Sequence, residues 1–414
     1  MRVLTFTNLY PSAAQPRHGI FVEHRIRQLT ASGRVSSRVV APVPWMPLAR
    51  FWSTRHAELA RVALNETRHG IAVQRARFLT IPGVTSWINP LSMALSALPT
   101  VRKLQRQQDF DLIDAHFVFP DGAAALLLGR WLGKPVVVTA RGTDINAFPR
   151  YAVPRRWIRW VTRHADALVT VSAALRQTWL DLGVAPERIT VLRNGVDLSL
   201  FVAADREAAR AELGFAGPTL LSVGHLIPDK GHHLVVDTLT LVSDLQVVIV
   251  GDGPLAAELL QHARAVGVES RLRLVGNVPQ AALARYYLAA DATVLASTSE
   301  GMANVLLESL ACGTPVIATA VGGNGEVVSA PVAGELIAER SAAAIAAAWA
   351  RMRSSHVDRE AVRRHAEQFG WAPTVTGLLQ LFEQVIRRRG LGTEARPQTP
   401  ARSSARVSSQ RDKR

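Results

Sequence analysis

Residues 293–319 read TVLASTSEGMANVLLESLACGTPVIAT, and this stretch decides the fold. The run 293–296 predicts a buried strand, residues 304–311 have the composition of a helix that Gly313 ends, and 315–319 predicts the next strand. Buried strands that alternate with helices are typical of a parallel sheet. The stretch therefore predicts a strand–loop–helix–strand unit of a doubly wound α/β domain.

The same alternation extends outward from this unit in both directions. Short apolar runs rich in β-branched residues recur at 2–7, 35–41, 112–115, 136–139, 167–171, 219–223, 246–250 and 271–275. The turn-forming segment 193–197, RNGVD, separates the two sets and indicates a hinge. We expect two doubly wound, parallel-sheet, Rossmann-like domains that face a cleft, one over residues 1–195 and the other over 196–372.

Two further segments follow the second domain. Residues 373–390 predict an amphipathic helix, with Leu378, Leu379, Phe382 and Ile386 on one face. From residue 391 to 414, Arg, Pro, Ser, Thr and Gln replace the apolar periodicity. We interpret residues 391–414 as a disordered basic tail.

Composition limits the class of protein. The chain has 414 residues, of which 48% are hydrophobic and 20% charged, and one cysteine, which excludes disordered, fibrous and disulfide-framework proteins. No segment approaches the roughly 18 to 20 apolar residues of a membrane span. The apolar run at the start of the sequence is too short for the apolar core of a signal peptide. We therefore expect a cytoplasmic protein.

The charge of +15 is unevenly distributed: residues 1–200 carry +14 and residues 201–390 carry −3. The first domain is thus expected to face something anionic. A helical pattern around Trp157 and Trp160 contains four of the cations, Arg155, Arg156, Arg159 and Arg163. This pattern favours peripheral docking on an anionic surface, namely the inner face of the cytoplasmic membrane. An ordinary crossover helix in an arginine-rich chain would show the same pattern.

The polar residues of the second domain follow predicted strands, at the carboxyl ends where such sheets bind ligands. Glu300 lies in the loop after one strand, and the helix that starts at Asn304 offers free backbone N–H groups for a phosphate. Glu308 lies on that helix, where a carboxylate can accept hydrogen bonds from a diol such as ribose. Lys230, one of only four lysines, begins a helix after another strand and suits a diphosphate, and His225 lies beside it. The plainer interpretation is that these charged groups are simply solvated.

The first domain offers a smaller set at its own strand ends. His116 ends the strand at 112–115, and Arg141 and Asp144 follow the next strand and offer a cation and a carboxylate to a polar ligand. Gly19, before the first helix, can bring a backbone amide close to a phosphate or sugar. All are expected to open toward the same crevice, although a lone histidine is more often structural.

One pattern is set aside. Asp109-Phe110-Asp111 matches the Asp-x-Asp pattern that binds a divalent metal with a nucleotide. It lies at the amino end of its strand, away from the predicted cleft. We therefore predict no metal site and no cofactor.

Taken together, these motifs resemble those of the retaining glycosyltransferases of family 4, with GT-B fold. The resemblance rests on Glu300-x7-Glu308, on Gly224-x5-Lys230-Gly231 and on the runs 251–254, GDGP, 194–197, NGVD, and 311–319, ACGTPVIAT. It extends to about residue 389, and the first half is similar to bacterial members that build exopolysaccharide or teichuronic acid. A retaining transferase is thus expected, which moves a sugar from a nucleotide diphosphate donor to a lipid-linked or saccharide acceptor in cell-envelope or exopolysaccharide biosynthesis.

The resemblance also implies residue roles. Glu300 and His116 would act at the reaction centre, with Glu300 on the sugar hydroxyls, Glu308 on the ribose and Lys230 on the diphosphate. The implied donor-binding set is Gly19, His225, Lys230, Gly301, Met302, Ala303, Asn304 and Glu308. The family uses no metal, and its C-terminal helix crosses back onto the first domain.

The chain departs from the family at three places. His225 stands where the family usually has arginine, so one fixed charge at the diphosphate is replaced by a group that changes charge near neutral pH. Arg141 stands where many members have histidine, and Met302-Ala303 replaces an aromatic–glycine pair.

Two alternatives remain open from the sequence. A sugar-nucleotide epimerase on the same fold is the nearest enzyme. A nucleic-acid-binding protein is suggested by the charge, but no recognised module interleaves aromatic residues with the arginines, so no nucleic-acid partner is predicted.

Overall fold

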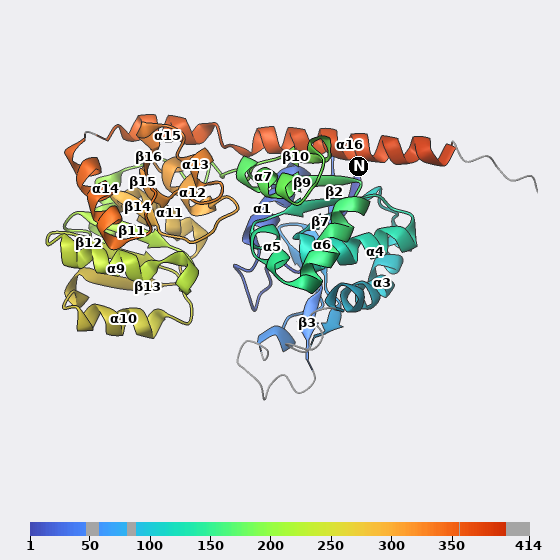
Figure 1. The fold of residues 1–414 in the computed structure, drawn as a ribbon, viewed down its shortest axis with the longest axis horizontal. Coiled ribbons are helices and arrows are strands. Elements are labelled where there is room, and N and C mark those ends of the chain that lie inside the picture. The colour runs from blue at the N-terminus through green and yellow to red at the C-terminus, as the bar shows by residue number, and fades with distance from the viewer. Residues whose placement is uncertain (47–57, 81–87, 356, 395–414) are drawn as a thin grey trace, which may run out of the picture.

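The computed structural model describes residues 1–46, 58–80, 88–355 and 357–394. These residues form two α/β domains side by side, as predicted (Figure 1). The first domain is built on an eight-stranded sheet, parallel except for the β4–β5 pair. In spatial order its strands are β10 (Ile189–Val191), β9 (Ala167–Thr170), β8 (Val136–Ala140), β7 (Leu112–His116), β1 (Arg2–Phe6), β2 (Ser36–Val40), β5 (Ile71–Gln74) and β4 (Asn65–Arg68).

Alternate residues of this sheet feed two separate cores, because successive side chains of a strand point to opposite faces. On β1, Val3 joins the cluster that α1 and α16 cover, whereas Leu4 joins the cluster that α3, α4 and α6 cover. Burial on both faces explains why these strands read as continuous apolar runs. The helices of this domain are α1 (Ile20–Ala31), α3 (Asn89–Gln107), α4 (Ala123–Leu132), α5 (Thr143–Asn146), α6 (Ala152–His164) and α7 (Ala173–Asp181).

The second domain contains a six-stranded, wholly parallel sheet. Its order is β13 (Leu272–Gly276), β12 (Gln246–Val250), β11 (Thr219–Val223), β14 (Ala292–Leu295), β15 (Val316–Thr319) and β16 (Gly334–Ile337). The helices are α8 (Arg206–Leu213), α9 (His232–Leu241), α10 (Ala256–Ala265), α11 (Gln280–Ala289), α12 (Asn304–Ala311), α13 (Asn324–Val327), α14 (Ala342–Ser354) and α15 (Arg359–Glu367). Helices α9, α10 and α14 pack on one face, and α11, α12 and α15 on the other.

The last helix, α16 (Trp371–Glu394), leaves the second domain and runs along the first (Figure 1). Leu378, Leu379, Phe382 and Val385 pack against the first sheet, together with Leu29 of α1. The helix continues four residues into the segment 391–414 that we predicted as a tail, since no proline follows Pro373, in its first turn, until Pro397. Residues 395–414 lie outside the described residues.

Several short elements complete the fold. Strands β3 (Val43–Trp45) and β6 (Arg77–Leu79) form a separate two-stranded parallel sheet at the edge of the first domain. One π turn and several single 3-10 turns connect the larger elements: Val118–Gly122, Phe148–Arg150, Pro186–Arg188, Pro228–Lys230, Glu269–Arg271 and Pro331–Ala333.

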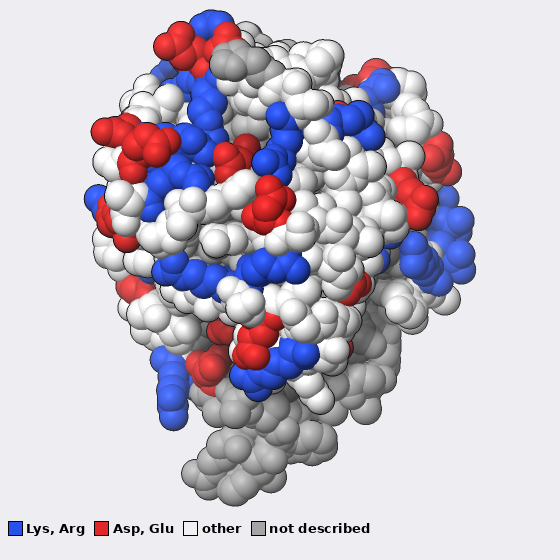
Figure 2. Space-filling view, turned by 90° about the vertical axis from the view of Figure 1, so that its left-hand side faces the viewer, with Lys and Arg blue, Asp and Glu red and all other residues white. Residues whose placement is uncertain are grey.

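The surface of the second domain carries charges of both signs. Figure 2 shows the end of the molecule formed by the second domain, where basic and acidic side chains are interspersed. Several charged side chains of this domain form ion pairs, such as Arg351 with Glu335 and Arg353 with Asp244. This surface offers no field of a single sign.

Candidate active site

A pocket of about 240 Å³ lies between the two domains, at the carboxyl ends of their parallel strands. The second domain contributes residues that follow β11 and β14, and the first contributes residues from α1, from the loop after β8 and from the hinge. The lining residues are Phe21, Arg141, Asn194, Val223, Gly224, Lys230, Leu295, Glu300, Gly301, Met302, Ala303, Asn304 and Val305. The structure thus brings Arg141, Lys230, Glu300 and the run 301–304 together around one pocket.

Glu300 and Lys230 form an ion pair on the pocket wall. Lys230 Nζ donates to Glu300 Oε1 at 2.5 Å, and Ser297 Oγ donates to the same oxygen at 2.7 Å. The Glu300 side chain is only 12% exposed. Lys230 and Ser297, which are far apart in the chain, together fix its position. A carboxylate held in this way can accept hydrogen bonds from sugar hydroxyls through Oε2.

The backbones of the two domains approach closely beside Glu300. A Cβ atom on Gly301 would clash with the carbonyl group of Arg141, and one on Gly142 would lie 3.0 Å from the backbone nitrogen of Gly301. Only glycine lacks that atom, so this pair allows the first domain to touch the loop that carries Glu300.

Glu308 lies one turn further along α12, behind the pocket wall. Its Oε2 accepts a hydrogen bond from Tyr287 at 2.9 Å, and its Oε1 accepts one from Gln280 at 3.5 Å. Burial raises the pKa of Glu308 from 4.5 to about 7, against the opposing effect of both hydrogen bonds. Across the cleft, Arg17 donates to Asn277 at 2.8 Å and also lowers the pKa of Glu308.

We expect the replacement Glu308→Gln to stabilise the ligand-free protein at pH 8 and to change its stability much less at pH 5. The folded protein binds the Glu308 proton more tightly than the unfolded chain, so this carboxyl lowers stability progressively as pH rises from 4.5 to about 7. A shift of this size corresponds to a gain of at most about 3 kcal/mol above pH 7. Urea unfolding at the two pH values measures the difference, with Glu335→Gln, a partly exposed carboxylate of the same domain, as control. An equal loss of stability at both would show that the hydrogen bonds of the carboxylate matter more than its charge.

On the first-domain side, Arg141 reaches the pocket and His116 lies behind it. His116 is completely buried and does not line the pocket. Its Nδ1 accepts a hydrogen bond from Arg141 Nη2 at 2.7 Å, and its Nε2 lies 3.2 Å from Asp114 Oδ2. Burial, aided by the cations Arg141 and Arg25, lowers the pKa of His116 to about 4, so the imidazole is neutral.

Asp144 is also buried, and it organises backbone rather than facing the pocket. Its carboxylate accepts hydrogen bonds from the backbone amides of Val118, Arg141 and Gly142, at 2.8 to 3.2 Å. Gly19 caps α1 in the left-handed region, with φ of 72°, and a Cβ there would clash with the backbone of Leu9. Neither residue lines the pocket, although both shape loops next to it.

His225 lies outside the pocket lining as well. Its ring is exposed, and its Nδ1 lies 2.5 Å from the carbonyl oxygen of Asp252. Its neighbours Gly224 and Lys230 do line the pocket. The backbone of this loop therefore reaches the pocket, while the imidazole is bonded to the next strand-end loop.

Three residues of the site were not singled out from the sequence. Phe21 stacks beneath Arg141, with the guanidinium carbon 5.2 Å from the ring centroid. Asn194, which the sequence placed in the hinge and in the NGVD run without a role in binding, forms hydrogen bonds to both domains. Ser297 supports Glu300. The position of Ser297 three residues before Glu300, in a strand-end loop, was the one local signal that could have identified it.

The Asp-x-Asp pattern lies away from the pocket. Asp109 pairs with Lys134 at 2.6 Å, and Asp111 accepts from the backbone amide of Arg2 at 2.7 Å. Within the described ranges, no group of three or more His, Cys, Asp or Glu side chains is placed to hold a metal ion. Among the helices of the same ranges, none is long and apolar enough to cross a membrane.

Comparison with known sequences gives consistent matches. Residues 205–369 match the family described as glycosyl transferases group 1, and residues 48–200 match glycosyltransferase family 4. The chain is 31% identical over 406 residues to Bacillus subtilis TuaC, which is named as a glycosyltransferase of teichuronic acid biosynthesis, and the match covers 96% of each chain. It is 34% identical over 303 residues to a D-inositol 3-phosphate glycosyltransferase of Geodermatophilus obscurus, covering 66% of each.

Solved structures match over nearly the whole fold. Sucrose-phosphate synthase from Thermosynechococcus elongatus superimposes with a TM-score of 0.76 at 19% identity, over 94% of this chain and 99% of that one. HepE of Anabaena, solved in complex with UDP, gives 0.71 at 20% identity, over 93% and 100%. At these identities the likeness concerns the arrangement of the two domains around their cleft.

Proposed function

Because the chain belongs to the family 4 glycosyltransferases of GT-B fold and is an enzyme of that class, we propose that it uses a nucleotide diphosphate sugar as donor and retains the anomeric configuration. The acceptor is a lipid-linked or saccharide hydroxyl in cell-envelope or exopolysaccharide biosynthesis. The observation that carries the proposal is the pocket in which Glu300, Lys230 and the amino end of α12 converge. The teichuronic acid relative and the UDP complex of HepE support the choice of acceptor class and donor class.

The proposed reaction assigns each group a task. Glu300 holds hydroxyls of the transferred sugar, Lys230 and the amides at the start of α12 hold the diphosphate, and Glu308 accepts from the ribose. The bond between the anomeric carbon and the diphosphate oxygen breaks while the acceptor oxygen attacks from the same face. The acceptor proton passes to the departing phosphate. The cations already in the pocket supply the positive charge, so we propose that transfer continues in the presence of EDTA.

Thermal-shift screening tests the donor class. UDP-, GDP- and ADP-sugars are added separately, and a ligand at 100 times its Kd stabilises the fold by about 2.7 kcal/mol. A shift with one base that Lys230→Ala abolishes is the expected result. No shift with any of the three would contradict the assignment of the donor. Product formation that saturates with an added acceptor separates transfer from epimerisation.

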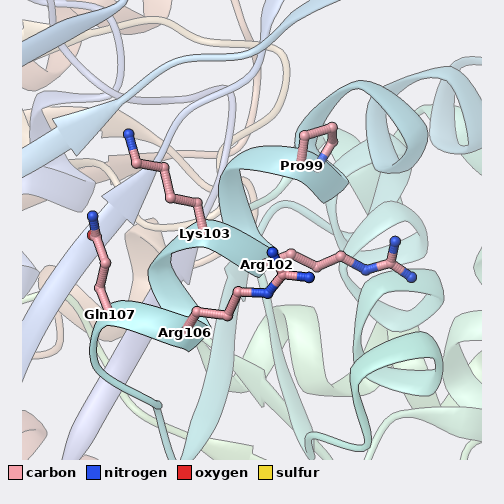
Figure 3. A pocket seen from close by; sticks show the side chains of 5 residues that line it. All are labelled: Pro99, Arg102, Lys103, Arg106 and Gln107. Atoms are coloured by element: carbon pink, nitrogen blue, oxygen red, sulfur yellow. The ribbon is translucent and has the colours of Figure 1, made fainter.

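We further propose that the first domain docks on anionic lipid. The four arginines of α6 are exposed, whereas Trp157 and Trp160 are partly buried, pack against the core and meet edge to face at 5.6 Å. This helix therefore presents its cations to solvent, while its two tryptophans pack inward. A separate basic groove of about 370 Å³ lies on α3 of the same domain, and Figure 3 shows that its lining residues come from this helix alone: Pro99, Arg102, Lys103, Arg106 and Gln107.

Reversing the charge of Arg155, Arg156, Arg159 and Arg163 to glutamate should lower binding to phosphatidylglycerol vesicles at least 10-fold at low salt. Each cation near such a surface contributes about 1 kcal/mol. Co-sedimentation measures binding. The matched control reverses four exposed arginines of the second domain, Arg264, Arg285, Arg351 and Arg353, and changes the net charge equally. Equal losses in the two variants would show that net charge, not this helix, governs binding.

A further inference from the structure

The two cations of the pocket differ in how their charge is balanced. Lys230 is paired with Glu300 at 2.5 Å. Arg141 forms no ion pair within the described part of the chain, and its guanidinium bonds only to a neutral imidazole and a neutral amide. Asp144 lies close in sequence, but its oxygens accept from backbone amides. Arg141 is therefore the pocket cation whose charge lacks a direct counter-ion.

Hydrogen bonding fixes where this charge lies. Arginine only donates, so His116 Nδ1 must accept from Arg141 Nη2 and carry no proton. The ring proton is then on Nε2, the nitrogen that faces Asp114 at 3.2 Å. The acceptor that meets the guanidinium is therefore Nδ1 of His116, while Asp114 lies beside the opposite nitrogen of the ring. This arrangement directs the guanidinium toward the pocket.

Asn194 holds the other side of the guanidinium and links it to the second domain. Its Oδ1 accepts from Arg141 Nη1 at 2.9 Å, so its amide group is oriented with Nδ2 outward. That Nδ2 donates to Oδ1 of Asn304, the first residue of α12, at 3.0 Å. Contact between the two domains therefore helps to set the position of Arg141.

We propose that Arg141 binds a phosphoryl oxygen of a substrate in this pocket, and that His116 and Asn194 are positioning residues that hold its guanidinium there. The inference rests on the proposed function and extends it to the first domain. A partly buried cation without a counter-ion is costly, and an anionic ligand offsets that cost. The remaining guanidinium N–H groups form a planar array that matches phosphate oxygens. The phosphoryl group belongs either to the donor diphosphate or to a phosphorylated acceptor.

Calorimetry with UDP, GDP and ADP on the full chain distinguishes the two sources. If Arg141 contacts the donor, Arg141→Met weakens binding of the preferred diphosphate about 10- to 100-fold, the effect of one charged hydrogen bond, and Arg141→Lys weakens it less. If it contacts the acceptor, diphosphate affinity is unchanged, but inorganic phosphate binds to the diphosphate-saturated wild type and not to Arg141→Met. Unchanged affinity in both experiments overturns the inference.

Lys230→Ala is the control. If Lys230→Ala loses diphosphate binding while Arg141→Met loses no binding, the proposed function stands and this inference fails. Binding of none of the probes to the wild type would contradict both.

Two pairs of variants test the positioning roles by the same anion affinity. His116→Asn keeps an acceptor near the place of Nδ1, and His116→Leu has nearly the same size without one, so we expect asparagine to retain most of the affinity and leucine to lose it. Asn194→Asp keeps an acceptor for Arg141 but adds a counter-charge, and it should weaken anion binding at least 10-fold while thermal unfolding stays near that of the wild type. Aspartate also loses the donor that Asn194 offers to Asn304, so a purely structural Asn194 would lower the unfolding temperature and leave anion affinity unchanged. Equal affinity of His116→Asn and His116→Leu, or full affinity of Asn194→Asp, would overturn the positioning role concerned.

Discussion

Purified Glu300→Gln should transfer sugar at least 10- to 100-fold more slowly than the wild type. The carboxylate accepts from Lys230 and Ser297 through Oε1 and leaves Oε2 for the donor sugar. Glutamine has the same shape and can still accept through one oxygen, so the pocket should persist. It loses the charge and replaces one acceptor with a donor. A hydrogen bond to a charged group contributes about 1.5 to 3 kcal/mol, which sets the smallest expected loss.

Initial rates at saturating donor and acceptor measure this effect. The matched control is Glu335→Gln, because Glu335 pairs with Arg351 on the exposed surface of the second domain and should not affect transfer. A loss confined to Glu300→Gln with unchanged thermal unfolding would place the carboxylate at the reaction. Wild-type rates in Glu300→Gln would remove Glu300 from the site.

Gly301→Ala should reduce kcat about 100-fold, although it adds one methyl group. The new Cβ would overlap the carbonyl group of Arg141, which belongs to the other domain. The clash separates the domains instead of disturbing the core of either one. Reacting groups displaced by about 1 Å can lose a factor of 10² in rate. Because Gly301 borders both Glu300 and Arg141, groups of both domains would be misplaced together.

The comparison that isolates this clash is Gly217→Ala. A Cβ at Gly217 would find its nearest atom at 3.8 Å, an ordinary contact, and the residue lies outside the pocket. Steady-state kinetics of both variants, with circular dichroism to confirm the fold, should show a loss only for Gly301→Ala. Equal activity of the two would mean that the productive complex does not need the contact between Gly301 and Arg141.

The alternation of strands and helices could be predicted because burial on both faces leaves continuous apolar runs in the chain. The run 246–250 coincides with β12, and the runs around 293–296 and 315–319 coincide with β14 and β15 to within one residue. The edge elements were missed. Strand β4, NETR, and the three-residue strands β3 and β6 carry no such run, since one side of each faces away from the core.

Local sequence also determined which residues follow the strands of each sheet. In a parallel sheet the carboxyl ends share one edge, so residues next to Glu300, Lys230 and Arg141 had to lie near a common crevice. That argument needs only the order of strands, and the pocket contains all three residues. It cannot say which way a side chain at a strand end points.

The tertiary structure alone decided that direction. His116 is the last residue of β7 and Arg141 is the first residue after β8, yet packing buries the imidazole and leaves the guanidinium in the pocket. Asp144 accepts from three backbone amides, and His225 bonds the carbonyl of Asp252. Each outcome depends on partners that lie on other loops, and Asn194 and Asn304 are brought together across 110 residues of chain. The apolar runs of strands are a property of consecutive residues and can be recognised from the sequence alone. The orientation of a polar side chain depends on which partners the fold brings within hydrogen-bonding distance.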